Sequence, residues 1–543
     1  MKDDSPDGCM SGSGSGAARS AGWCHVDRVL AGVWLALAGV WTVAAGRDLA
    51  FHVTSRSWTS MWESAPLMVA MRVVRGQPVY ADWHDGPVHL AIYGPLYYQA
   101  LGWAGRWAGA DEIGLITIGR GWSIAWLAVG LAGVLCFVRR QGGPCWAGLI
   151  GIGCTGLFTP TALRFIASAR PDMMAAALSL IGLTAALGRR RFSRLVGACL
   201  LSMAWLTKVT AVGGVLAAVT CLAWRREWRR LAWVAGGFVA VNAGVVAALW
   251  VATDGWFLKH LTAASDAPAG VRYVWFMLTH RPVEVQVRYL FVFPALALLT
   301  LLLPRLMPGA RAPAPGRSAS DARPARPATA GVREAAMFFG CSLLVALATA
   351  CRQGSDRNYL IEPTLAAGAV MGTWAAHVAG LRDRRAWLWT RAAATLALIS
   401  PMLMMLPDRF AVSSERRRQE ADLLSPYQEP ALAWARSLPR PLLCLDSWLT
   451  YRAGVPNDLN DPIAYRSMVI AGGPDPIAAR VRKGYYRCIV TLNRADEPGY
   501  SLYGDIASDW PALREAVLAR YRPAERSVSS PPDGRWYEYV PVE

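Results

Sequence analysis

Three carboxylates near the start of the chain have the chemistry of a general base. Glu63 lies in the stretch SMWESAPLMVAMRVVRGQPVYADW at 60–83, directly after the first long apolar run, and Asp48 and Asp82 lie on either side of it. A carboxylate within hydrogen-bond reach of a hydroxyl or an amine can take its proton as that group attacks an electrophile. Glu63 is therefore our first candidate for the base, with Asp48 and Asp82 as the alternatives.

Cationic and polar residues follow in three further stretches. They are ARPDMM at 169–174, WLTKVT at 205–210 and ACRQGSDRNYLIEP at 350–363. Cations placed where negative charge develops stabilise a departing phosphate, so these stretches equip the chain to displace a phosphate leaving group. The residues that we assign to binding a phosphate-bearing donor are Arg170, Asp172, Lys208, Arg352, Arg357, Asn358 and Tyr359.

Each of these stretches also has a plain structural interpretation. Asp172 follows Pro171 at the expected start of a helix, where its carboxylate can cap the helix or pair with Arg170. Lys208 lies within an apolar run, a position that favours a functional role, but its amine can also extend to the membrane interface. The stretch 350–363 can be an ordinary solvated loop, so both interpretations stay open.

Long apolar runs separate the polar stretches and must position them. Hydrophobic residues make up 54% of the 543 residues and 25 residues are Trp, a composition typical of an integral membrane protein. Runs of this length cross a bilayer as helices, because hydrocarbon cannot satisfy exposed backbone polar groups. We predict about eleven spans, near 27–46, 113–138, 145–161, 171–188, 195–206, 209–224, 231–252, 284–304, 335–351, 361–379 and 388–406.

The distribution of arginines predicts the orientation of these spans. The formal charge of +18 does not indicate nucleic-acid binding, because the arginines stand in short clusters between apolar runs. Cytoplasmic loops are enriched in Arg and Lys. With the amino terminus inside, the clusters at 139–140, 189–191, 225–230, 305–333 and 381–385 all lie in the cytoplasm, and the four polar stretches lie outside.

Two segments need special treatment in this topology. The apolar segment 91–109 would invert every later loop if it crossed the membrane, so we expect it on the outer surface or partly inserted. The stretch 195–224 is too long for one ordinary span and has Lys208 in its middle. We therefore expect two short helices that meet near Lys208.

The expected fold class is an all-α polytopic membrane protein with a small C-terminal α/β domain outside the cytoplasm. Its parts are a disordered tail at 1–26, a transmembrane domain at 27–406 and the α/β domain at 407–543. The transmembrane domain includes a first external loop at 47–112 and a disordered cytoplasmic loop at 305–333. Cys444 and Cys488 lie in predicted strands and either pair or stay buried as thiols. The spacing of Cys and His predicts no metal site.

The order and spacing of the motifs resemble those of the C-type (GT-C) glycosyltransferases, in particular relatives of protein mannosyltransferases (family 39-like) and of lipid A aminoarabinose transferases. Glu63 precedes Gly76 by thirteen residues, GQPVYADW follows, and YGPLYY supplies Tyr97 and Tyr98. Over roughly residues 30–490, the stretches ARPDMMAAALSL, LTKVTA, GWFLKHLTAAS and DRNYLIEP resemble further motifs of the family. One departure is Trp62, which stands where the family usually has an acid beside the glutamate.

The resemblance implies an enzyme of the bacterial cytoplasmic membrane that moves a sugar from a polyprenyl-phosphate donor to a glycan, lipid or protein acceptor at the outer face. Glu63 would deprotonate the acceptor, and the cations would neutralise the phosphate. A divalent ion stays open, because pyrophosphate-using relatives need one and monophosphate users generally do not. The residues that the resemblance places in loops near the acceptor are Tyr80, Tyr97, Tyr98 and His260.

Two other functions fit the same residues. A transporter or flippase for a lipid-linked saccharide would recognise phosphate with the same cations, although transporters often contain repeated halves and we find no internal repeat. An inactive relative that serves as a scaffold fits the absence of an acid at Trp62. Sugar turnover by the purified protein would favour the enzyme, protected movement across a vesicle the transporter, and neither the scaffold.

Overall fold

The structure of the chain, a computed structural model, describes most of the predicted helical core and C-terminal region. The described ranges are 63–84, 86–156, 166–263, 270–279, 328–351, 357–379, 429–470, 475–491, 510–529 and 535–542, with isolated positions between 36 and 53 and at 473, 494 and 495. The predicted spans at 284–304 and 388–406, the loop 305–333 up to 327 and most of the span 27–46 lie outside the described residues.

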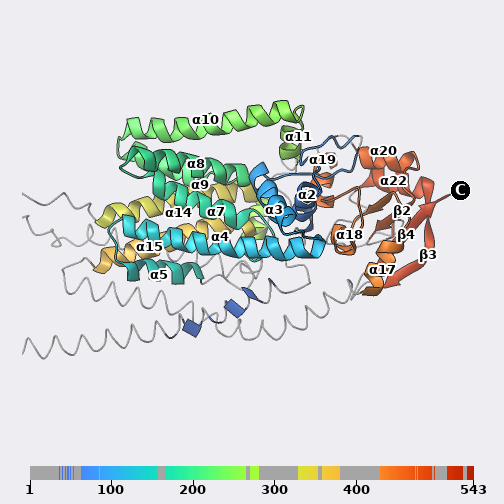
Figure 1. Ribbon diagram of the computed structural model, residues 1–543, viewed down its shortest axis with the longest axis horizontal. Helices are drawn as coiled ribbons and strands as arrows, with labels where there is room; N and C mark the ends of the chain where they lie inside the picture. Colours follow the sequence, from blue (N-terminus) through green and yellow to red (C-terminus); the bar gives the residue numbers. More distant parts are fainter. Residues whose placement is uncertain are drawn as a thin grey trace, which may run out of the picture.

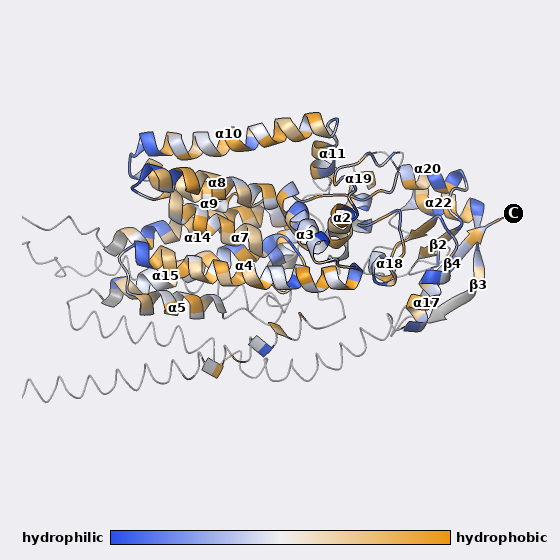
Figure 2. Cartoon of the chain, viewed as in Figure 1, coloured by the Kyte–Doolittle hydropathy of each residue, from blue (hydrophilic) through white to orange (hydrophobic). Residues whose placement is uncertain are grey.

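A bundle of helices forms one half of the molecule (Figure 1). Within the described ranges, three helices are long and apolar enough to cross a membrane, at Glu112–Arg140, Trp228–Ala252 and Ala330–Ala350. Figure 2 shows the apolar character of the labelled helices of the bundle. Apolar runs of this kind fit a membrane location. The helices of the bundle are α4 (Glu112–Arg140), α5 (Cys145–Gly156), α7 (Asp172–Ala186), α8 (Arg191–Thr207), α9 (Gly213–Trp224), α10 (Trp228–Ala252), α14 (Ala328–Ala350) and α15 (Ile361–Ala379).

Small residues allow the helices of the bundle to pack closely. A Cβ atom added at Gly151 of α5 would lie 2.5 Å from the backbone oxygen of Gly368 of α15, so only glycine fits this crossing. Close backbone approach through small residues is how helices associate where lipid removes the hydrophobic driving force between them. Larger side chains, among them Phe137, Phe338 and Trp374, fill the core between α4, α14 and α15.

The two segments singled out in the topology form short helices. The stretch 195–224 is split into α8 and α9, and Lys208 lies in the turn between them. The segment 91–109 forms α3 (Pro95–Trp107), which packs against α2 (Ser64–Val74) beside the bundle (Figure 1). Trp103 and Trp107 of α3 are exposed, a placement typical of aromatic residues at a membrane interface.

The C-terminal region contains a four-stranded sheet covered by helices. The sheet order is β1-β2-β4-β3, with β1 and β2 parallel and the other pairs antiparallel. Three of the strands lie where the sequence predicts strands, at 441–446, 486–492 and 535–540. The elements are α17 (Glu429–Ser437), β1 (Leu442–Cys444), α18 (Ser447–Ala453), α19 (Pro462–Ile470), α20 (Pro476–Arg482), β2 (Cys488–Thr491), α22 (Pro511–Arg520), β3 (Tyr521–Ser529) and β4 (Arg535–Pro541).

Hydrogen bonds join the C-terminal region to the loop around residues 80–93, which lies at one end of the bundle. Asn460 accepts a hydrogen bond from the backbone of Leu90 at 2.8 Å and donates to its carbonyl oxygen at 3.1 Å. Arg480 donates to the carbonyl oxygen of Trp83 at 2.8 Å. Each of these bonds satisfies a backbone group that the loop would otherwise leave unpaired. The C-terminal region therefore sits on the loop at one end of the bundle.

The arginine clusters of the described helices lie at the opposite end of the bundle. The carboxyl end of α4 and the amino ends of α8 and α10 carry Arg139–Arg140, Arg191 and Arg229–Arg230, and these ends point away from the C-terminal sheet in Figures 1 and 2. The described part of the bundle thus separates an arginine-rich end from an end that carries the loop 80–93 and the sheet.

Candidate functional site

Asp172 is the centre of a buried polar cluster at the end of the bundle nearest the C-terminal sheet. Its Oδ1 accepts from Lys208 Nζ at 2.5 Å and from Asn358 Nδ2 at 2.7 Å, and its Oδ2 accepts from Arg170 Nε at 3.0 Å. All four side chains are buried. Buried charges are stable only when they are paired and hydrogen-bonded, so the four groups form one unit.

Helix ends bring these residues together. Asp172 is the first residue of α7 after Pro171, where the helix dipole favours an anion. Lys208 has an extended backbone at the carboxyl end of α8, so the chain leaves the helix there. Asn358 lies in the short 3-10 helix η2 (Arg357–Leu360) that precedes α15. Three separate breaks in the helical bundle therefore converge on Asp172.

A small cavity adjoins the cluster. It has a volume of about 30 Å³, enough for water and too small for a sugar. Lys208 Nζ lies 4.2 Å from the ring centroid of Tyr359, within the range of a cation–π contact. The wall of the cavity includes Asp172, Lys208, Asn358, Tyr359 and Glu362.

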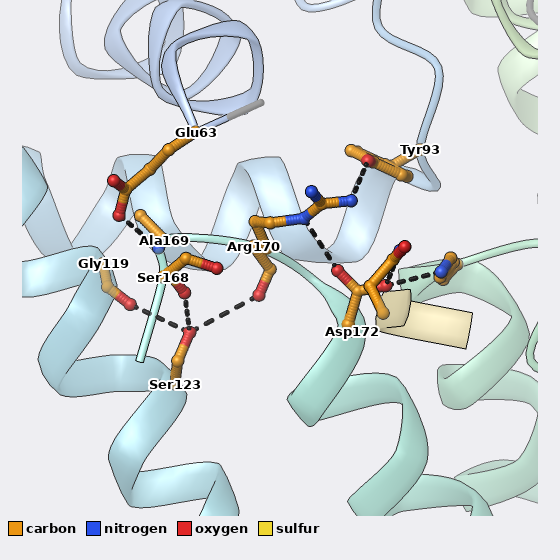
Figure 3. A network of polar contacts seen from close by, with 10 residues as sticks. Glu63, Tyr93, Gly119, Ser123, Ser168, Ala169, Arg170 and Asp172 are labelled. Atoms are coloured by element: carbon orange, nitrogen blue, oxygen red, sulfur yellow. Dashed lines mark hydrogen bonds and ion pairs between the residues drawn. The ribbon is translucent and has the colours of Figure 1, made fainter. Parts of the chain in front are cut away.

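The turn before α7 connects this cluster to the interior of the bundle (Figure 3). Arg170 points toward Asp172 and also donates to the hydroxyl of Tyr93 at 3.2 Å. The hydroxyl of Ser123 on α4 donates to the carbonyl oxygen of Ser168 at 2.7 Å. The backbone of the turn is thus held from α4 while its arginine reaches toward the loop.

Glu63 lies away from the cavity, in a buried and hydrogen-bonded environment. It is fully buried at the start of α2, where Arg120 donates to both of its oxygens, from Nε at 2.8 Å and from Nη2 at 2.7 Å. The backbone N–H of Ala169 donates to the same carboxylate at 2.7 Å. These contacts give Glu63 a structural role, because its carboxylate holds the turn 168–170 through Ala169. Its role as the base stays a prediction.

The tyrosines expected near the acceptor hold the loop rather than line the cavity. The hydroxyl of Tyr80 donates to the carbonyl oxygen of Tyr93 at 3.1 Å, and the hydroxyl of Tyr98 accepts from the backbone N–H of Tyr93 at 3.2 Å. Tyr97 is fully buried in α3. Together Tyr80 and Tyr98 fix the backbone of Tyr93, whose side chain meets Arg170.

His260 of α11 (Trp256–Ala263) also has a structural environment. Its Nδ1 accepts from the backbone N–H of Ala91 at 3.1 Å, so its Nε2 carries the proton and donates to the carbonyl oxygen of Ala81 at 2.9 Å. Burial lowers the pKa of His260 to about 4. A neutral imidazole with both nitrogens engaged is a bridge between α11 and the loop 80–93.

The remaining predicted residues lie apart from the cluster or outside the residues that the structure describes. Asp82 pairs with His84 on an exposed part of the loop, at 2.9 Å, and does not line the cavity. Asp48 and Arg352 lie outside the described residues, and of Arg357 only the backbone position in η2 is described. Of the predicted donor-binding residues, the structure therefore brings together Arg170, Asp172, Lys208, Asn358 and Tyr359.

The sequence interpretation missed the buried charge of Arg120 and assigned no role to Glu362, although Glu362 lies in the polar stretch 350–363. Arg120 is a lone arginine inside the apolar run of α4, and Glu362 is a carboxylate at the start of α15. Glu362 Oε1 accepts from Ser179 Oγ at 2.5 Å and from the backbone N–H of Gly214 at 3.1 Å. An ionisable residue inside an apolar run is itself a signal of function or of a buried pair, and that signal could have identified both.

Metal-ligating residues do not cluster in the described ranges: no group of three or more His, Cys, Asp or Glu side chains there has a geometry that could hold an ion. Cys444 and Cys488 are free and buried in β1 and β2. Burial raises the pKa of both thiols. Of the two alternatives for this pair, the structure has the buried thiols.

Comparison with solved structures identifies the fold. No protein-family model and no curated protein matches the sequence. A crystal structure of ArnT from Cupriavidus metallidurans bound to undecaprenyl phosphate matches 96% of this chain and 98% of its own, with a TM-score of 0.51 and 14% identity. Apo ArnT from the same organism matches at a TM-score of 0.49 and 13% identity, covering 96% of this chain and 98% of its own.

A third match is the apo oligosaccharyltransferase of Archaeoglobus fulgidus, with a TM-score of 0.49 and 11% identity, covering 84% of this chain and 69% of its own. At such identities the likeness concerns the fold alone, and the match to the lipid-bound ArnT spans both the bundle and the C-terminal region. The chain therefore shares the fold of ArnT.

Proposed function

We propose that this chain is a membrane glycosyltransferase that moves a sugar from a polyprenyl-phosphate-linked donor to an acceptor at the outer face of the cytoplasmic membrane. The observation that carries the proposal is the buried cluster in which Arg170 and Lys208 meet Asp172 at the end of the bundle. The fold shared with ArnT, which was crystallised with undecaprenyl phosphate, supports a lipid-phosphate donor.

The cluster suits the departure of a phosphate. An acceptor hydroxyl or amine attacks the anomeric carbon, the bond from that carbon to the phosphate oxygen breaks, and polyprenyl phosphate leaves with the electron pair. The leaving group gains negative charge in this step, so cations that are fixed in a buried site stabilise the transition state more than the donor. Lys208 and Arg170 are such cations, and Asp172 holds both of them in place. Asn358 in turn donates to Asp172.

Glu63 stays our first prediction for the base that takes the proton of the acceptor, and the cavity wall supplies a second candidate. Of the two carboxylates in that wall, Asp172 and Glu362, Glu362 is this candidate. Asp172 already accepts hydrogen bonds from the cations and the amide of the cluster, and such bonds favour its charged form. Because the cavity has room only for water, the donor sugar meets the cluster at its open side and does not fit wholly inside.

The distribution of charge supports an external site. The described arginine clusters lie at the end of the bundle opposite Asp172 (Figures 1 and 2), and arginine-rich ends usually face the cytoplasm. With that orientation, the Asp172 cluster, the loop 80–93 and the C-terminal domain at 407–543 are extracytoplasmic. A lipid-linked donor is then the form in which an activated sugar reaches the site.

A matched pair of lysine variants tests the proposal. Sugar transfer is followed in membranes supplied with a labelled polyprenyl-phosphate sugar, at equal protein levels. We expect Lys208→Met to lower transfer about 10²- to 10³-fold, the range for loss of one transition-state donor. Lys259→Met is the control, because Lys259 stacks on Trp256 at 3.8 Å and does not line the cavity. Wild-type transfer by folded Lys208→Met would refute the site.

A catalytically inactive scaffold is the second candidate. The observation that favours it is the pairing of Glu63 with Arg120, which removes the carboxylate beside Trp62 from acid–base chemistry. Wild-type protein that binds the lipid-sugar donor but releases no polyprenyl phosphate over many hours, with a range of glycan, lipid and protein acceptors, would favour the scaffold. Release of polyprenyl phosphate that depends on Lys208 would exclude it.

A further inference from the structure

A second polar pocket lies at the arginine-rich end of the bundle, far along the helices from Asp172. It has a volume of about 570 Å³ and is lined by five arginines, one glutamate and two tryptophans. These residues come from the start of α8 and from the turn between α9 and α10. The wall is therefore built from two helix ends and a turn that are adjacent in space.

The charge of the pocket is strongly positive. Glu227 is its one carboxylate, and it pairs with Arg230 at 2.8 Å. The side chain of Arg194 bonds to the start of its own helix, since its Nε donates to the carbonyl oxygen of Arg190 at 3.4 Å. Among the described residues, Arg226 and Arg229 have no carboxylate partner. A guanidinium group is opposite in charge to a phosphate and can donate two hydrogen bonds to its oxygens, so the pocket suits a phosphate.

Arg226 supplies a cation at a backbone position that favours glycine over residues with a side chain. Its φ is +57°, in the left-handed region that L side chains seldom adopt. Its backbone N–H closes the end of α9 by donating to the carbonyl oxygen of Ala223 at 2.9 Å. Glycine is the residue best suited to such a turn, yet here an arginine side chain lines the pocket.

Exposed apolar side chains surround the pocket on the membrane side. Phe192 is 76% exposed and Trp233 is 63% exposed, both within a turn or two of the pocket arginines. Only 11% of the apolar window of α10 is buried against the described part of the chain, so this helix has an exposed apolar surface next to the pocket. A ligand with a phosphate and hydrocarbon chains would contact both the arginines and this surface.

We propose that this pocket binds the phosphodiester headgroup of an anionic phospholipid, with the acyl chains along Phe192 and α10. Basic pockets at the ends of transmembrane helices recognise anionic headgroups in this way. The preference of cytoplasmic loops for arginine explains the sign of the charge, but it predicts neither a pocket nor discrimination between headgroups. The site is separate from the Asp172 cluster and does not depend on the proposed transfer reaction.

Native mass spectrometry of the purified full chain in mild detergent tests the site. The probes are phosphatidylglycerol, phosphatidylcholine and inorganic phosphate. We expect one phosphatidylglycerol to bind in preference to phosphatidylcholine and to resist competition by millimolar inorganic phosphate. Each arginine near a membrane surface changes the affinity for an anionic lipid about fivefold, so Arg226→Gln with Arg229→Gln should weaken binding about 30-fold.

The control removes the same charge from the same end of the bundle. Arg139→Gln with Arg189→Gln leaves the residues of the pocket intact, because neither arginine lines it. Without a contact to the bound headgroup, the loss of these two charges should weaken binding much less than the loss of the pocket pair. Arg226→Gly is the variant most compatible with folding, because the positive φ at this position is readily adopted by glycine. This variant should weaken binding about fivefold.

Three results would overturn the proposal. The first is equal binding of phosphatidylglycerol and phosphatidylcholine to the wild type, which needs no variant to fold. The second is an equal loss with the pocket pair and the control pair, which would show general attraction by the arginine-rich end. The third is displacement of the lipid by inorganic phosphate, which would show a site for free phosphate instead of a lipid headgroup.

Discussion

Replacement of Glu63 by glutamine should destabilise the protein, because Glu63 neutralises a buried arginine. Arg120 is 0% exposed, and both its Nε and its Nη2 donate to the carboxylate of Glu63. Glutamine has nearly the same shape and keeps an oxygen for the N–H of Ala169, but it removes the negative charge. The loss of the negative charge that both Arg120 donors contact is what makes the single variant costly.

The magnitude follows from the burial of both partners. Breaking a buried ion pair from one side costs about 3–5 kcal/mol, a large fraction of the about 5–15 kcal/mol that stabilises a typical folded domain. Replacement of both members by uncharged groups of similar volume is often neutral. We therefore expect Glu63→Gln to lose most of its folded protein and Glu63→Gln with Arg120→Met to recover it.

The double variant separates positioning from acid–base chemistry. Thermal unfolding in detergent measures the stability of the four proteins of the cycle, and sugar transfer per folded molecule measures the reaction. If Glu63 only positions the turn 168–170, transfer returns with stability in the double variant. If Glu63 is the base, the double variant folds but transfer stays about 10²- to 10⁴-fold lower, and a purely positioning role would be refuted. Wild-type stability of Glu63→Gln alone would refute the ion-pair argument.

Three further predictions concern the parts that hold the site. Gly94→Ala should lower the melting temperature of the full chain, because its Cβ would lie 1.9 Å from the backbone oxygen of Leu206, whereas an alanine at the open position Gly76 should cost little beyond its backbone strain. Burial lowers the pKa of His260 from 6.5 to about 4, so on acidification the unfolded chain binds a proton before the folded chain does. The free energy of unfolding should therefore decrease between about pH 6.5 and about pH 4, by up to about 3 kcal/mol. The same dependence of stability on pH in His260→Gln would contradict this. Cys444 and Cys488 should resist maleimide in the folded protein and react after unfolding, and a mass change on reduction alone would show a disulfide instead.

The sequence predicts the parts of this fold that depend on local pattern. Long apolar runs place α4, α10 and α14 within a few residues of their ends, since hydrocarbon requires continuous helices. Lys208 splits the stretch 195–224 into two helices, as its position in the run suggests. Asp172 lies at a helix start after proline, which also follows from a local rule.

The partners of buried charges depend on contacts between distant segments and could not be read in the same way. Glu63 and Arg120 are 57 residues apart, and Asp172 and Asn358 are 186 residues apart. The sequence could show that Asp172 and Lys208 lie near the same membrane face, and they do meet. It could not show that the interior supplies Arg120 as a partner for Glu63.

The two ends of the bundle differ in how their cations are balanced, and this difference bears on how a phosphate would bind. Near the C-terminal sheet, Lys208 and Arg170 already share the carboxylate of Asp172. A phosphate arriving there must either join this network or displace Asp172 from Lys208, because a buried lysine cannot stay unpaired. Binding that loosens Asp172 would also free a carboxylate to accept a proton, so donor binding and activation of the acceptor would be coupled. At the other end, five arginines face one glutamate, and an anion can bind there without breaking an existing pair.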